Sequence, residues 1–167
     1  MNIQNQWGFP VFVNDVTLSK DLEEKADNIA ATLVPPKLLI LTGSGGIGKE
    51  RFALELVSRF YKRAQCKKRP KYIYAPSIES IRPIPGEEYE PVHYVVFGSA
   101  DQIDARYSRA VLARVFDVIA NGNLAIMIVR SLESLYAKYG QDFVQSYASV
   151  IRVIDLGGSK EIVLQGI

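Results

Sequence analysis

The sequence is poor in cysteine and in long hydrophobic runs, and both scarcities exclude whole classes of protein. It contains one cysteine, Cys66, so no internal disulfide can form and we expect a reducing compartment. No apolar run approaches the roughly 18 residues that a membrane helix needs. The first six residues lack a basic region followed by an apolar run, so we expect no signal peptide. Together these absences predict a soluble, cytoplasmic protein with no membrane partner.

An excess of charge of either sign is also absent. The formal net charge is +2, which is too small to imply nucleic-acid binding by itself. Internal repeats and low-complexity tracts are missing as well. What is present is an ordinary globular composition in 167 residues, which is enough to bury a real core. We therefore expect one domain over residues 1–167, with an N-terminal arm (1–17), a core (18–155) and a tail (156–167).

The most informative stretch is an apolar run followed by a glycine-rich turn, residues 38–49. Within it, Gly43 to Lys49 match the pattern G-x-x-x-x-G-K of phosphate-binding loops. Apolar residues then recur at helical spacing over residues 52–60, so strand, loop and helix follow in the order that such a loop needs. The pattern fails at the next position, where Glu50 replaces the hydroxyl residue that binds magnesium.

The loop has the parts for binding an anion, and one part that opposes it. Backbone N–H groups and a helix N-terminus favour a phosphate, and Lys49 would add a positive charge. Glu50 opposes binding, because like charges about 4 Å apart cost on the order of 4 kcal/mol at an effective dielectric of 20. Bound magnesium would offset part of this cost. We expect weak binding of ATP or ADP with Mg2+, or none, and a plain connecting turn remains the alternative. The candidate phosphate-binding residues are Gly43, Gly45, Gly46, Gly48, Lys49 and Glu50.

The acids that hydrolysis requires are missing from the third predicted strand. A hydrolysing enzyme of this type has an acid at the end of that strand to hold magnesium, often followed by a second acid that activates water. Here the strand 93–98 ends in Gly98, and Ser99 follows. We interpret Asp101 and Asp104 as helix-capping or first-turn acids rather than a displaced metal site. We therefore expect no catalytic residue, no metal site and no hydrolysis by this chain alone.

Strands and helices are predicted to alternate along the chain. The predicted strands cover residues 37–42, 72–75, 93–98, 124–129 and 149–154. The predicted helices cover residues 18–33, 50–64, 103–119 and 133–147, the last one broken at Gly140. The tail 159–167 is either a short helix or an edge strand. This alternation favours an α/β fold with a parallel sheet between helices, and right-handed crossovers place the glycine loop at the carboxyl edge of the sheet.

Four further features have plain structural interpretations. We interpret the basic segment 62–71 as a favourable helix end and a solvated turn, while a contact with DNA or an acidic partner stays open. His93 is interpreted as structural. Aromatic residues near positions 7–13 should form an extended arm over the core. Tyrosines on the later helices should pack or line an interface, namely Tyr107, Tyr136, Tyr139 and Tyr147.

Several segments resemble, in the same order, the base domain of AAA+ clamp-loader subunits. The run VVFGSADQI resembles their third-strand signature, in which an aspartate pair precedes Ala-Asp. The stretch 124–131 is similar to the strand that carries their sensor position, and Tyr147 falls where they have an arginine finger. Among these subunits, the chain resembles the bacterial DNA polymerase III delta-prime subunit. The resembling segments are 15–50, 52–66, 95–103, 110–115, 124–131 and 146–148.

The resemblance implies a P-loop NTPase-like (AAA+) three-layer fold with a five-stranded, mostly parallel sheet. It implies a scaffold or interaction module in DNA replication or repair, with other clamp-loader or DNA polymerase subunits as partners and at most weak or indirect DNA contact. The chain departs from the family at Glu50, Gly98, Ser99 and Tyr147 and keeps only Cys66 of the zinc module. We expect no complete lid or collar. We therefore expect a non-catalytic, delta-prime-like subunit.

Two other hypotheses stay open. One is a degenerate RecA-like recombinase paralogue, since RecA and AAA+ cores share the loop and the alternation of strands and helices. The helix start at Asp101 and the segment 146–148 favour AAA+. The other is a nucleotide-dependent ATPase that uses Lys49 with a displaced acid such as Asp101.

Overall fold

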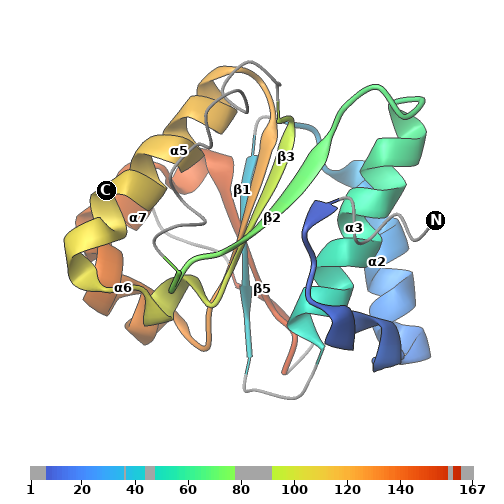
Figure 1. Cartoon of the computed structure of the whole chain (residues 1–167), viewed down its shortest axis with the longest axis horizontal. Coiled ribbons are helices and arrows are strands. Elements are labelled where there is room, and N and C mark those ends of the chain that lie inside the picture. The colour runs from blue at the N-terminus through green and yellow to red at the C-terminus, as the bar shows by residue number, and fades with distance from the viewer. Residues whose placement is uncertain (1–6, 36, 44–47, 78–91, 158–159, 163–167) are drawn as a thin grey trace.

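A six-stranded sheet divides the molecule into three layers (Figure 1). The computed structural model describes residues 7–35, 37–43, 48–77, 92–157 and 160–162, with the backbone alone for the last three. The helices α2 (Lys20–Thr32) and α3 (Lys49–Arg63) cover one face of the sheet. The other face is covered by α5 (Ser108–Ala120), α6 (Leu132–Tyr139) and α7 (Gln141–Ser146).

The strand order is β2-β3-β4-β1-β5-β6, and the first five strands run parallel. Their bounds are β1 Lys37–Thr42, β2 Pro70–Tyr74, β3 Tyr94–Gly98, β4 Leu124–Ile128, β5 Ile151–Asp155 and β6 Lys160–Ile162. The five predicted parallel strands are confirmed. The tail adds an antiparallel edge strand, β6. Of the two alternatives for the tail, a short helix or an edge strand, residues 160–162 therefore form the strand.

Local capping signals explain where most helices begin and end. The Ser19 hydroxyl accepts the N–H of Leu22 at 3.3 Å and caps α2, as predicted. Gly140, at φ +86°, separates α6 from α7, which confirms the predicted break. The predicted helix 103–119 starts later than expected, because Ile103 is extended and places its side chain in the core. Two 3-10 turns, Ala100–Gln102 and Ala105–Tyr107, precede α5.

The sheet separates two hydrophobic clusters, as expected for a parallel sheet covered on both faces. Leu39 and Leu41 pack with α2 and α3, whereas Leu38 and Ile40 pack with α5, α6 and α7. The N-terminal arm joins the first cluster and contains a 3-10 helix, Val11–Asp15, so it is less extended than predicted.

The arm is anchored by its aromatic side chains. Trp7 packs edge-on against Tyr61, with ring centroids 5.1 Å apart, and Phe9 lies 4.8 Å from Tyr72. The prediction was wrong for Phe12, which is 53% exposed. In the described part of the chain, no helix is both long and apolar enough to span a membrane.

The carboxyl ends of β1, β3 and β4 meet at one edge of the sheet. There the N–H of Gly43 donates to the carbonyl of Arg130 at 3.1 Å, and the N–H of Val129 donates to Leu41. Parallel pairing of β4 with both β1 and β3 brings the segments after these three strands together. This edge holds the predicted glycine loop and is where ligands bind in open parallel sheets.

Candidate functional site

The glycine loop leaves β1 at Gly43 and enters α3 at Gly48. Both residues have positive φ, +142° and +81°, a region that favours glycine. A β-carbon at position 48 would also lie 3.0 Å from Val16. Two of the predicted binding residues, Gly45 and Gly46, lie outside the described residues. The two described ends of the loop, Gly43 and Gly48, thus have backbone conformations that glycine adopts without strain.

A pocket of about 330 Å³ opens beside the start of α3. It is lined from four directions: the N-terminal arm, the first turn of α3, the turn after β3 and the end of β4. Its lining residues are Phe12, Val16, Gly48, Lys49, Glu50, Ser99, Asp101, Gln102, Ile128, Val129 and Arg130. Three of the predicted binding residues therefore share one pocket with Asp101, and also with Arg130, to which the sequence analysis assigned no binding role.

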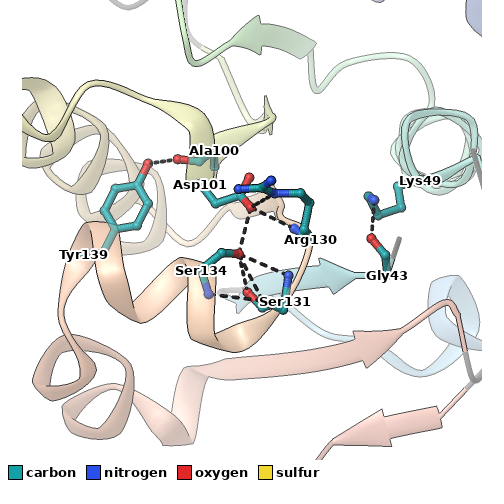
Figure 2. A network of polar contacts seen from close by, with 8 residues as sticks. All are labelled: Gly43, Lys49, Ala100, Asp101, Arg130, Ser131, Ser134 and Tyr139. Atoms are coloured by element: carbon teal, nitrogen blue, oxygen red, sulfur yellow. Dashed lines mark hydrogen bonds and ion pairs between the residues drawn. The ribbon is translucent and has the colours of Figure 1, made fainter. Parts of the chain in front are cut away.

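Lys49 is held against the loop rather than pointing into solvent. Lys49 is only 7% exposed, and its Nζ donates to the carbonyl of Gly43 at 2.5 Å (Figure 2). Burial lowers the pKa of Lys49, and this effect outweighs the attraction of Glu50 and Asp101. A bound anion would favour the ammonium form, so the lysine is placed to respond to a negatively charged ligand.

Asp101 is the centre of a buried polar network. Its Oδ2 accepts hydrogen bonds from the Ser134 hydroxyl at 2.7 Å, the Arg130 Nε at 3.0 Å and the Arg130 backbone N–H at 3.1 Å (Figure 2). The Asp101 side chain is 1% exposed. Burial alone would raise the pKa of Asp101, but the hydrogen bonds from Ser134 and Arg130 lower it below its ordinary value. The carboxylate is therefore ionised at neutral pH, with Oδ2 held by internal donors and Oδ1 buried without a hydrogen-bond partner among the described residues.

This network was missed by sequence reasoning. Asp101 does lie in the first turn of the 3-10 segment Ala100–Gln102, as interpreted, but its carboxylate turns inward. Its partners Arg130 and Ser134 are 29 and 33 residues away in the sequence. The signal that would have indicated them is the position of Arg130 at the carboxyl end of β4, next to the carboxyl end of β3 in the sheet.

The first turn of α6 and the buried Tyr139 fix the network in place. Ser131 and Ser134 form a reciprocal cap, with the N–H of Ser134 donating to Ser131 Oγ at 3.1 Å and the N–H of Ser131 donating to Ser134 Oγ at 3.2 Å. Tyr139 donates its hydroxyl to the carbonyl of Ala100 at 2.7 Å. Helix α6 is thus bound to the turn that carries Asp101 (Figure 2).

The empty acid position at Gly98 has a structural explanation. An added β-carbon there would lie 1.7 Å from the Tyr72 hydroxyl oxygen and 2.4 Å from its ring carbon Cζ. Tyr72 is buried, and burial raises the pKa of its phenol above the ordinary value. The space in which a strand-three carboxylate would begin is therefore filled by an aromatic side chain from β2.

The remaining predicted residues lie apart from the pocket network or have structural partners. Asp104 accepts the N–H of Arg106 at 3.0 Å and caps the turn before α5, as interpreted. His93 Nδ1 accepts the N–H of Arg69 at 3.1 Å, which supports its structural role. Tyr147 is 44% exposed and packs against Phe116 with centroids 4.8 Å apart. Among the described residues, no group of three or more His, Cys, Asp or Glu side chains is placed to hold a metal ion.

Solved structures that share this fold include two from named proteins. No protein-family model matches the sequence, and no curated protein sequence matches it. Domain III of the Thermotoga maritima replication initiation protein DnaA matches 71% of this chain with a TM-score of 0.50 and 13% identity. The chain spans 55% of that structure. The DnaI structure matches with a TM-score of 0.54 and 15% identity over 86% of each chain.

At 13% and 15% identity, the likeness is one of fold alone. The chain has an α/β, P-loop NTPase-like three-layer fold with five parallel strands flanked by helices, as the sequence predicted. Two features lie at the carboxyl edge of its sheet: the Tyr72 phenol beside Gly98 and the pairing of Asp101 with Arg130 at the pocket.

Proposed function

We propose that this chain is a non-hydrolysing AAA+ module that acts as a scaffold or interaction subunit in DNA replication or repair. One of its structural neighbours is a replication initiation protein, which supports the biological setting. The finer part of the proposal, a delta-prime-like role beside other clamp-loader or DNA polymerase subunits in the cytoplasm, rests on the sequence resemblance. The basic segment 62–71 would allow a weak contact with DNA.

The main support for the absence of hydrolysis is the close packing of Tyr72 against Gly98. Hydrolysis in this fold class needs an acid at the end of the third strand. Here the acid is missing, and the Tyr72 phenol fills the space in which its side chain would start. The loss therefore involves two strands and is not repaired by one substitution.

The ATPase alternative is favoured by one observation only. Lys49 and Asp101 line the same pocket, as a lysine and a displaced acid would have to. However, Asp101 Oδ2 already accepts three hydrogen bonds, and its Oδ1 is buried, with no hydrogen-bond partner among the described residues. The neighbour that is a replication initiation protein favours a role in replication over the RecA-like alternative.

Phosphate release from ATP with magnesium, measured with and without DNA, tests the proposal. We expect no release that depends on Lys49, so the wild type and Lys49→Ala should give the same background. Co-purification of the tagged chain with clamp-loader or polymerase subunits should be equal for these two proteins. Phosphate release that disappears in Lys49→Ala would overturn the proposal.

A further inference from the structure

The described pocket residues do not suit the magnesium ion that P-loop NTPases normally use. Mg2+ requires near-octahedral oxygen ligands and is usually held by one or two carboxylates together with the substrate phosphates. Of the two carboxylates that line this pocket, Asp101 binds Arg130 and Ser134 through Oδ2, while its Oδ1 is buried and has no hydrogen-bond partner among the described residues. Position 98 has no room for a third carboxylate, because Tyr72 occupies it. Glu50 is left as the one accessible carboxylate among the described lining residues.

Arg130 brings a fixed positive charge to the same space. Its Nε and its backbone N–H are both bound to Asp101, which holds the side chain in position. Arg130 is 61% exposed in its side chain and lines the pocket, and the described residues provide no other partner for its two terminal NH2 groups. Its charge also contributes to lowering the pKa of Lys49, so the two cations act on one region.

We propose that this pocket binds the phosphates of a nucleoside diphosphate without a divalent cation, with Arg130 supplying the charge that magnesium would otherwise bring. A guanidinium presents paired N–H donors that match phosphate oxygens, and Lys49 and the N-terminus of α3 add further positive potential. Asp101 is a positioning residue, because it holds Arg130 through Nε. The inference concerns binding and is independent of whether the chain acts as a scaffold.

The size and lining of the pocket indicate which ligand fits. A volume of about 330 Å³ is at the lower end of the roughly 300–1,000 Å³ typical of small-molecule sites. Phe12, Val16 and Ile128 provide an apolar part for a base beside the cationic part. Glu50 opposes every added negative charge, so a diphosphate should bind more tightly than a triphosphate.

Titration calorimetry of the whole chain with ADP tests the proposal in two buffers, one with EDTA and one with excess magnesium chloride. We expect binding in EDTA that is at least as tight as in magnesium. Inorganic pyrophosphate and adenosine separate the contributions of phosphate and base: pyrophosphate should bind without metal, and adenosine alone should not bind. ATP should bind more weakly than ADP in EDTA.

Substitutions test whether Arg130 provides the charge that binds ADP. Arg130→Ala should weaken ADP binding in EDTA by tenfold or more, and Asp101→Asn should weaken it by a smaller factor. Arg106→Ala is the matched control, since it breaks an exposed pair with Asp104 (Nη2 to Oδ2, 2.8 Å) outside the pocket lining and should leave affinity unchanged. If Arg130→Ala fails to fold, Arg130→Gln keeps a donor for Asp101 while removing the charge.

Three outcomes would overturn the inference: ADP binding that disappears in EDTA, affinity that is the same in the Arg130 variants, and no binding in either buffer. Failure here is distinguishable from failure of the proposed function, which is measured by phosphate release. A protein that hydrolyses ATP contradicts the scaffold proposal, whereas a protein that binds ADP only with magnesium contradicts this one.

Discussion

The hydroxyl oxygen of Tyr72 lies 1.7 Å from the point at which a β-carbon at position 98 would stand. The cause is the pairing of β2 with β3, in which Tyr72 lies opposite Val96. Gly98 is two residues further along the same face of β3, within diagonal reach of an aromatic side chain. Tyrosine at 72 and glycine at 98 are therefore complementary, and the acid position of the fold class is closed by packing.

This complementarity predicts strong coupling between the two positions. Gly98→Ala should destabilise the protein by about 1–3 kcal/mol, as overpacking of a core does. In a Tyr72→Ala background, which itself should cost about 3–5 kcal/mol, the same alanine should be nearly neutral. Urea unfolding of the four proteins gives the coupling free energy. An equal cost of Gly98→Ala in both backgrounds would show that the phenol is not the obstacle.

Asp101→Asn should reduce stability at neutral pH by about 1–2 kcal/mol, because it removes the charge that accepts from Arg130 and Ser134 while Arg130 stays largely solvated. The folded-state pKa of Asp101 is lowered, so its contribution is present above the ordinary value of 3.8 and is lost as pH falls through the lower folded value. Urea unfolding of both proteins as a function of pH should show the difference shrinking in acid.

The exposed pair of Asp104 and Arg106 offers a control for that measurement. Asp104→Asn should change stability at neutral pH by clearly less than Asp101→Asn does, since exposed ion pairs contribute little. A loss as large as that of Asp101→Asn would mean that burial of the Asp101 network is not what makes it stabilising.

Tyr139→Phe should destabilise the protein by about 1 kcal/mol or slightly more. The variant leaves the Ala100 carbonyl without the 2.7 Å hydrogen bond that joins α6 to the turn carrying Asp101. Hydrogen exchange should show faster opening of residues 100–102 than in the wild type. Tyr136→Phe is a suitable control, because no hydrogen bond of its hydroxyl is observed in the described part of the chain. Equal effects of the two changes would contradict the assigned role.

Lys49→Met should leave the protein at least as stable as the wild type near neutral pH while abolishing anion binding. Burial lowers the folded pKa of Lys49, so the charged lysine costs stability at pH values below that pKa, and the cost fades as pH approaches the unfolded value of 10.5. Methionine removes the charge and keeps the apolar stem. Thermal unfolding at neutral and alkaline pH should show any advantage of the variant disappearing as pH rises.

Glu50→Thr should strengthen phosphate binding without restoring hydrolysis. The change removes the carboxylate that lines the pocket beside Lys49, and threonine supplies the hydroxyl of the phosphate-loop pattern. Turnover should stay at background because Gly98 and Ser99 remain. Calorimetry and phosphate release are measured on the same preparation, and hydrolysis regained by this one substitution would refute the argument based on the third strand.

Local features of the fold were predictable because their causes lie within a few residues. The apolar run before Gly43, the Ser19 cap and the break at Gly140 each indicate an element or its end, and all three are confirmed. The start of α5 was predicted too early, since apolar spacing alone does not reveal that Ile103 is extended and that Asp104 caps a separate turn. Periodicity indicates which residues face the core, and turn geometry decides where a helix begins.

The candidate site, like the fold, was predictable only where the cause lies within a few residues of the sequence. The sequence by itself determined the glycine loop with Lys49, and the absence of acids at positions 98 and 99, because a motif and its gaps are read residue by residue. The tertiary structure alone decided that Tyr72 fills the empty position and that Asp101 binds Arg130. Those contacts depend on which strands are neighbours and in which register they pair, and strand order and register are set by packing of the whole sheet.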